Sequence, residues 1–235
     1  MVILRPRVFV TRQFFPEALE VLTDAADTEV WPDDEPPTTE QLLEKVVEAD
    51  GILTNIMDRI DADVFQAAHR LKVVSQLGVG VDNIDVAEAT RRGVLVGNTP
   101  GVLAKATADI AFGLLMSAAR RISEGDRWLR AGNWKMQYHP MVWLGAEVHG
   151  ATLGIIGMGQ IGVEMAKRAR GFDMRVIYYS RTRKLELESQ LGMEYFEPSD
   201  LLSTADFVTL HIPLTLETRH FIGERELRLM KPAAI

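Results

Sequence analysis

The sequence predicts an α/β protein of two parallel-sheet domains, and three observations carry this prediction. Short apolar runs alternate with amphipathic helical stretches along the chain. A turn sequence, Asn98-Thr99-Pro100-Gly101, separates two such series. A glycine motif from Gly157 to Gly162 lies between an apolar run and a helical stretch. The length of 235 residues also suits two modest domains better than one.

The first hundred residues predict alternating strands and helices. Thr38 with Gln41, and Asp85 with Glu88, have the spacing of capping boxes. Proline and acidic residues predict a loop at 32–37. We expect strands at 7–11, 28–31, 51–54, 72–77 and 94–96, and helices at 16–26, 38–49, 62–68 and 85–92. Residues 1–99 are therefore expected to form a flavodoxin-like domain with a parallel sheet.

The second series begins with a long apolar helix at 102–122, followed by a helix to Ala131 and an irregular aromatic-rich stretch at 132–150. Further strands are expected at 152–156, 175–179, 194–196 and 206–210, with a helix at 161–170. The last residues, 231–235, resemble the opening of another strand. Residues 100–235 are therefore expected to be an incomplete Rossmann domain in a truncated chain.

The glycine motif predicts a dinucleotide site rather than a structural turn. Thr152–Ile156 is typical of a strand buried on both faces, and helical spacing follows the glycines. Gly157 allows a tight turn, Gly159 lets a pyrophosphate approach the backbone, and Gly162 lets helix and strand pack closely. The helix start adds free N–H groups and a positive dipole end for the phosphates.

The segment after the second strand of this domain bears on the choice of cofactor. That strand ends in Ser180-Arg181-Thr182-Arg183-Lys184, without an acidic residue at its end. An acid would accept hydrogen bonds from a free ribose 2′-hydroxyl, whereas hydroxyls and cations favour a 2′-phosphate. We therefore expect NADP(H), with NAD(H) possible and a solvated basic loop as the alternative interpretation.

Composition excludes several classes of protein. Hydrophobic residues make up 47% of the chain, but no apolar run approaches a membrane span, and the N-terminus is too short and too charged for a signal peptide. The absence of cysteine excludes disulfides, thiol catalysis and cysteine-ligated metals. The net charge of −7 gives no support to binding of nucleic acid or of an anionic membrane. We expect a cytoplasmic protein without a metal site.

Several stretches together resemble the D-isomer-specific 2-hydroxyacid dehydrogenases, especially their glyoxylate/hydroxypyruvate reductases. They are LGVGVDNID (77–85), GVLVGNTPGVL (93–103), ATADIAFGLLMSAARR (106–121), TLGIIGMGQIG (152–162), YYSRTRK (178–184) and LHIPLTLETRHFIG (210–223). The resemblance implies reduction of glyoxylate or hydroxypyruvate to the hydroxy acid by hydride transfer from NAD(P)H. The alternative is a non-catalytic NAD(P)-binding redox sensor or corepressor of the same fold.

The resemblance also implies roles for residues by position. The backbone N–H groups of Val79 and Gly80 would hold the substrate carboxylate, as suits a glycine-flanked turn after a strand, and Leu53 would line the substrate pocket. The catalytic arginine, glutamate and histidine are expected beyond Ile235, so this chain alone is expected to be inactive. Cofactor contacts are implied at Thr107, Gly157, Met158, Gly159, Gln160, Ile161, Gly162, Ser180, Arg181, Thr182, His211 and Pro213.

Other conspicuous residues are given structural roles. His211 and His220 are expected on the cofactor side rather than as proton donors. Turn formation and helix capping explain Asp82, Asn83 and Asp85 better than a metal site does. The resemblance implies a homodimer, and a place in its interface is favoured over a substrate cleft for Trp128, Trp134, Tyr138 and Trp143.

Overall fold

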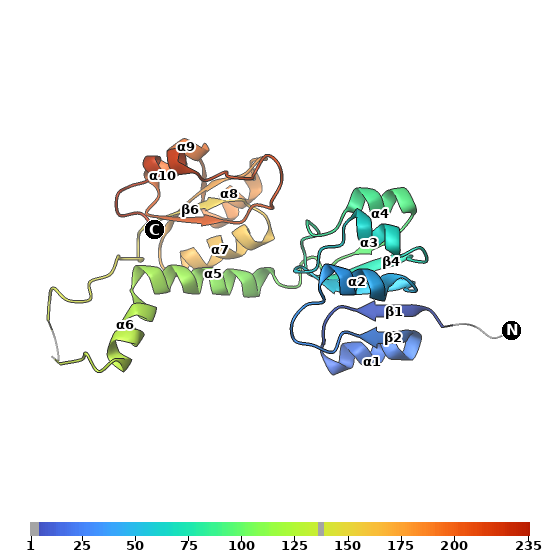
Figure 1. The fold of residues 1–235 in the computed structure, drawn as a ribbon. Coiled ribbons are helices and arrows are strands. Elements are labelled where there is room, and N and C mark those ends of the chain that lie inside the picture. The colour runs from blue at the N-terminus through green and yellow to red at the C-terminus, as the bar shows by residue number, and fades with distance from the viewer. Residues whose placement is uncertain (1–4, 136–138) are drawn as a thin grey trace. The chain divides into compact units, whose positions relative to one another are not determined.

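The computed structural model describes residues 5–135 and 139–235. The described chain falls into two compact units, the first ending at Gly101 and the second spanning Val102–Ile235. Each unit holds one parallel sheet with its helices (Figure 1). The predicted α/β class with two parallel sheets is therefore confirmed. No helix in the described ranges is both long enough and apolar enough to span a membrane.

The first unit has a five-stranded sheet in the order β2-β1-β3-β4-β5, with every pair parallel. This is the flavodoxin-like order, in which the carboxyl ends of the strands share one edge. The elements are β1 (Arg7–Val10), α1 (Pro16–Ala25), β2 (Asp27–Val30), α2 (Thr39–Val46), β3 (Gly51–Asn55), α3 (Ala62–Ala67), β4 (Val73–Leu77), α4 (Val86–Arg92) and β5 (Leu95–Gly97).

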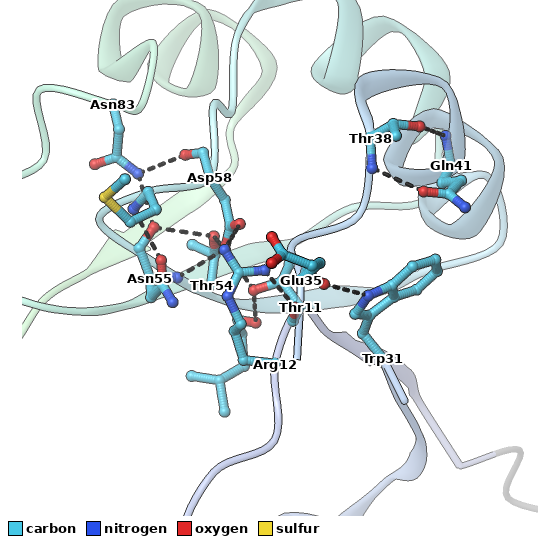
Figure 2. A network of polar contacts seen from close by, with 12 residues as sticks. Thr11, Arg12, Trp31, Glu35, Thr38, Gln41, Thr54, Asn55, Asp58 and Asn83 are labelled. Atoms are coloured by element: carbon cyan, nitrogen blue, oxygen red, sulfur yellow. Dashed lines mark hydrogen bonds and ion pairs between the residues drawn. The ribbon is translucent and has the colours of Figure 1, made fainter. Parts of the chain in front are cut away.

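The two predicted capping boxes differ in the structure. At α2, Gln41 N donates to Thr38 Oγ1 (3.3 Å) and Thr38 N donates to Gln41 Oε1 (2.8 Å), so this box is complete (Figure 2). At α4, Asp85 accepts from Glu88 N (2.9 Å), but the Glu88 carboxylate binds Arg91 Nε (2.8 Å). The second box is therefore only half formed, because a neighbouring guanidinium competes for the glutamate.

One hydrophobic core serves the first unit. Phe9, Ile52 and Val74 from the central strands are buried together with Val64 and Phe65 of α3. Every residue of this cluster lies between positions 9 and 96. The sheet is therefore held by side chains of its own unit.

The second unit has a four-stranded parallel sheet in the order β8-β7-β6-β9. This corresponds to strands 3-2-1-4 of the Rossmann order, so the strand order reverses between β6 and β9. The elements are α5 (Ala104–Ala119), α6 (Ile122–Arg130), β6 (Thr152–Ile156), α7 (Gln160–Arg170), β7 (Arg175–Tyr179), α8 (Leu185–Leu191), β8 (Glu194–Tyr195), α9 (Pro198–Thr204), β9 (Phe207–Leu210) and α10 (Glu224–Leu229).

Helices cover both faces of this second sheet. Leu153 and Ile155 of β6 belong to a buried cluster with Met165 of α7, whereas Ile156 belongs to a second cluster with Leu201 of α9. All members of these two clusters lie between positions 108 and 230. The strand β6 is thus buried on both faces, as its apolar run predicts.

The predicted helix at 102–122 is interrupted. Helix α5 ends at Ala119, and Arg121 has φ +54°, a left-handed conformation that an α-helix cannot continue through. The Ala119 carbonyl instead accepts a hydrogen bond from Ala146 N (2.8 Å). A second helix, α6, then starts in a new direction (Figure 1).

The predicted strand opening at 231–235 forms only one pairing. Ile235 N donates to Asp206 O (3.0 Å) and Val208 N donates to Ile235 O (2.8 Å), so Ile235 lies beside β9. The described residues 231–235 carry no strand of their own.

Candidate functional site

Three loops of the second unit meet at the carboxyl ends of β6, β7 and β9. Gly157, directly after β6, has φ +103°, and its N–H donates to Tyr179 O (2.8 Å) at the end of β7. His211 N, after β9, donates to Ile156 O (2.7 Å). A Cβ on Gly157 would lie 2.5 Å from His211 O. Only glycine combines this backbone conformation with this close approach.

The other two glycines of the motif have different surroundings. A Cβ on Gly162 would lie 2.2 Å from Gly157 O, so helix α7 packs directly on the glycine turn. A Cβ on Gly159 would meet nothing within 4 Å, and its φ of −85° is accessible to any residue. The fold itself therefore does not require glycine at 159.

The start of α7 lacks a side-chain cap, because Gly159 occupies the N-cap position. The first N–H groups of a helix have no intrahelical partner. The space that a Gly159 side chain would fill is open, and the N–H groups of the first turn of α7 are uncapped. This arrangement fits a pyrophosphate, which binds through such N–H groups and the helix dipole. The described residues thus accommodate a dinucleotide at this point.

A cavity of about 510 Å³ lies against the glycine turn. Of the predicted cofactor residues, it is lined by Gly157, Met158, Gly159, Ser180, Arg181, Thr182, His211 and Pro213. The others are not in its lining: Gln160, Ile161 and Gly162 form the first turn of α7, and Thr107 lies on α5.

The sequence reasoning missed several residues of this cavity. The additional lining residues are Tyr179, Ile212, Thr215, Glu217, Thr218 and Phe221, beside Lys184 of the predicted cationic segment. Most of them belong to the stretch LHIPLTLETRHFIG, in which the sequence alone points to only His211 and Pro213. The Tyr179 and Phe221 rings stack with centroids 6.1 Å apart and an interplanar angle of 21°, so they form one aromatic wall.

The basic segment after β7 is divided between two roles. Arg183 forms a bidentate ion pair with Glu188 (2.8 Å for each hydrogen bond) and does not line the cavity. The buried Tyr178 hydroxyl donates to Glu188 Oε1 (2.7 Å) and accepts from Lys184 N (2.7 Å). Of the three cations of this segment, Arg181 and Lys184 therefore line the cavity, whereas Arg183 is engaged by Glu188 outside it.

We call Tyr178, Arg183 and Glu188 the clamp of this segment. Hydrogen bonding by Arg183, and then by the Tyr178 hydroxyl, lowers the pKa of Glu188 to about 2. Burial raises the pKa of Tyr178, which keeps its hydroxyl protonated as a donor. The clamp therefore keeps its charges near neutral pH and fixes the backbone of the segment.

One acid does line the cavity, although none stands at the end of β7. Glu217 comes from the loop after β9, and its carboxylate accepts from Thr215 Oγ1 (2.7 Å). The hydrogen bond from Thr215 lowers the pKa of Glu217, and the charge of Arg181 lowers it further. Glu217 is therefore ionised beside the cationic segment.

His211 is placed as a structural and lining residue. Its Nε2 lies 2.9 Å from Thr209 Oγ1, and burial lowers the pKa of the imidazole. His220 lies on the same loop with φ +55°. Of these two residues, only His211 lines the cavity.

The predicted substrate residues lie in the first unit. Leu53 is in β3, and Val79 and Gly80 follow β4, which pairs in parallel with β3. Both turn residues are exposed to solvent. Among the described residues, no backbone or side-chain acceptor is bonded to the Val79 or Gly80 N–H. Two adjacent N–H groups of this kind can accept an anion.

Other predicted features have ordinary structural partners. Asp85 caps α4, and Asn83 accepts from Gln76 Nε2 (2.8 Å). Across residues 5–135 and 139–235, no group of three or more acidic or histidine side chains could hold a metal ion. The Trp128 ring lies 6.2 Å from that of Trp134 and 5.0 Å from that of Trp143; Tyr138 lies outside the described residues.

Comparison with known proteins agrees with this geometry. Residues 112–235 match the family model described as D-isomer specific 2-hydroxyacid dehydrogenase, NAD binding domain. A glyoxylate reductase of Aeropyrum pernix is 53% identical over 234 residues, covering 98% of this chain and 70% of that protein. A glyoxylate reductase of Korarchaeum cryptofilum is 50% identical over 232 residues, with 99% and 70% covered.

A solved structure is similar over the same range. The crystal structure of the TT0316 protein from Thermus thermophilus is 42% identical, with a TM-score of 0.90, and covers 97% of this chain and 71% of that chain. Each glyoxylate reductase compared above is matched over 70% of its own length. The chain belongs to the D-isomer specific 2-hydroxyacid dehydrogenases, enzymes that use a nicotinamide dinucleotide cofactor.

Proposed function

We propose that the full-length protein reduces glyoxylate, or the related keto acid hydroxypyruvate, to the 2-hydroxy acid with NADPH. In this proposal residues 1–99 form the substrate domain and residues 100–235 the NAD(P)-binding domain. The observation that carries it is the cavity at the reversal of strand order, where the glycine turn meets the cationic segment after β7. The relatives named glyoxylate reductase support the choice of substrate. The bound cofactor supplies the hydride.

The preference for NADPH rests on the charge of the cavity wall. Arg181 and Lys184 line it together with the hydroxyl residues Ser180 and Thr182. A guanidinium and neighbouring hydroxyls can bind a 2′-phosphate through charge-assisted hydrogen bonds. Glu217 lines the same cavity and supports the alternative, because its carboxylate could accept hydrogen bonds from a free 2′-hydroxyl. We favour NADPH because two cations face one acid.

Phosphate binding is assigned to the start of α7. The N–H groups of Gln160, Ile161 and Gly162 have no side-chain cap, and Gly159 leaves the approach open. Met158 and Gly157 form the turn that directs these groups. We assign Thr107 to the nicotinamide-side phosphate, and His211 and Pro213 to the adenosine ribose.

The substrate carboxylate is assigned to the turn after β4. The Val79 and Gly80 N–H groups would bind it, and Leu53 would contact the small carbon skeleton. The proton donor and the arginine that orients the keto acid are expected beyond Ile235. His211 and His220 are not proposed for either task, since both lie on the loop that follows β9.

We further propose a cytoplasmic homodimer. Helices α5 and α6 carry exposed apolar side chains, including Ile110, Leu114 and Ile122. The packed rings of Trp128, Trp134 and Trp143 lie in and after α6. An apolar surface of this kind is typical of a protein interface. An interface role for these residues is preferred to a role in the substrate cleft.

The test is steady-state oxidation of NADPH and of NADH by glyoxylate, measured on the full-length protein by the absorbance of the reduced cofactor. We expect turnover with glyoxylate and a lower KM for NADPH than for NADH. Absence of turnover with glyoxylate, hydroxypyruvate and other 2-keto acids would refute the enzyme and favour a non-catalytic cofactor-binding protein. Tighter binding of NADH would refute only the cofactor preference.

A further inference from the structure

A buried polar network lies at the carboxyl ends of β1 and β3 in the first unit (Figure 2). At its centre is Asp58, whose Oδ2 accepts from Thr11 Oγ1 (2.5 Å), Thr54 Oγ1 (2.9 Å) and Asn55 N (3.1 Å). Arg12 Nη2 donates to Asp58 Oδ1 (2.8 Å). Both carboxylate oxygens are therefore bonded, and the buried charge is paired.

The network extends from Asp58 to the turn after β4 through two amide side chains. Asn83 Nδ2 donates to Asp58 O (2.7 Å) and Asn55 O (3.1 Å), which ties it to the end of β3. Gln76 Nε2 donates to Asn83 Oδ1 (2.8 Å) and to Gly80 O (3.2 Å). Gln76 is only 1% exposed, so both bonds are shielded from water.

These bonds act on the turn through the planarity of the peptide group. In a trans peptide the C=O and the following N–H point in opposite directions, so a held carbonyl fixes the direction of the next N–H. Three consecutive carbonyls of the turn are held: Gly78 O by Thr99 N (2.9 Å), Val79 O by Asn98 Nδ2 (2.8 Å) and Gly80 O by Gln76 Nε2 (3.2 Å). The first two bonds set the directions of the Val79 and Gly80 N–H groups. The Gln76 bond to Gly80 O fixes the next peptide group, between Gly80 and Val81, and so holds the turn at its carboxyl end.

We propose that Gln76 and Asn83 are positioning residues for the substrate. They anchor Gly80 at the carboxyl end of the Val79–Gly80 turn, and so keep the turn in the conformation in which its N–H groups face the carboxylate. The inference rests on the proposed function of this turn. An apolar side chain would suit a buried strand position such as 76 at least as well, so the amide is explained by its partner in the turn. Both amides are neutral and add no charge beside an anionic substrate.

The test variant is Gln76→Met in the full-length protein. Methionine keeps the length and packing of the side chain and removes the bonds to Asn83 and Gly80. We expect kcat/KM for glyoxylate to fall about tenfold, as for the loss of one well-placed hydrogen bond, with KM for NADPH unchanged. The Kd of oxamate, an unreactive carboxylate analogue, should rise by a similar factor. Asn83→Ser is the second variant, should Gln76→Met fold poorly.

The matched control is Asp50→Asn. Asp50 is buried in the same unit at the amino end of β3, where it accepts from Arg7 N (3.0 Å) and Arg70 Nη2 (3.2 Å). Its replacement weakens the unit without touching the turn. If Gln76 had only a structural role, Gln76→Met and Asp50→Asn would raise the Kd of oxamate by the same factor when they lower Tm by the same amount. That result would overturn the inference.

The outcomes also separate this inference from the proposed function. If the wild-type protein turns over no 2-keto acid, the proposed function fails. If the wild type reduces glyoxylate and Gln76→Met retains its kcat/KM and oxamate affinity, only the positioning role fails.

Discussion

The substitution Gly159→Ala is expected to lower the affinity for the cofactor while leaving the stability of the fold almost unchanged. The new Cβ would meet no atom within 4 Å, and φ at this position is −85°, which alanine adopts freely. The free energy of unfolding should therefore change by no more than about 0.5 kcal/mol. The methyl group would occupy the space in front of α7, where we place the pyrophosphate.

The expected loss of cofactor affinity follows from the bonds at stake. Hydrogen bonds from backbone N–H groups to a charged phosphate contribute about 1.5–3 kcal/mol each. Displacing the pyrophosphate enough to lose one of them raises Kd by about ten- to a hundredfold, since roughly every 1.4 kcal/mol is tenfold. Affinity and stability should thus respond very differently to one methyl group.

Fluorescence titration with NADPH and chemical denaturation measure the two quantities on the same variant. Gly125→Ala in α6 is the control, because its Cβ also meets nothing within 4 Å and it lies away from the cavity. Unchanged NADPH affinity in Gly159→Ala would refute the assignment of the pyrophosphate. A loss of stability as large as that of Gly162→Ala would refute the claim that position 159 is open.

Three further predictions concern the same unit. Gly162→Ala should lower the free energy of unfolding by about 1–3 kcal/mol, because its Cβ would lie 2.2 Å from Gly157 O; urea denaturation measures this. Glu188→Gln should raise the Kd of NADPH more than that of NADH by loosening the clamp, whereas Glu194→Gln, which breaks the exposed pair with Arg175, should change neither in the same titrations. Burial lowers the pKa of His211 below its usual value of about 6.5, so its stabilisation is present above that pH and is lost as pH falls through the lowered pKa. Thermal melts from about pH 7 to about pH 5 should therefore show a larger fall in Tm for the wild type than for His211→Gln, and equal falls would contradict the role of burial.

Local patterns were sufficient where one stretch of sequence determines its own structure. The Thr38 cap has its partner three residues away, and the apolar run of β6, the glycines after it and helix α7 form one continuous stretch of strand, turn and helix. The short helices α8, α9 and α10 were not predicted. None of them has a side-chain N-cap that would mark its start, whereas α4, which is equally short, is marked by Asp85.

The composition of the site depended on contacts that no local pattern encodes. Glu217 reaches the cavity from the loop after β9, far along the chain from the cationic segment that it faces. Arg183 looks like a phosphate ligand in the sequence, but its partner Glu188 lies on the following helix and engages it. The hydrogen bond between Gln76 and Asn83 could not be predicted either, because the sequence does not indicate which carbonyl an amide side chain will bind.

The separation of the hydrophobic clusters lets the two units melt independently, so that one unit can serve as a reference for ligand binding to the other. In the described chain, the cluster around Phe9 and those around Leu153 and Ile156 share no residue. A calorimetric scan is therefore expected to contain two melting events rather than one. Added NADPH should raise only the event of the second unit, by RT ln(1 + [L]/Kd), while the first serves as a reference in the same tube. Occupancy of the nucleotide site can then be followed without any catalytic turnover.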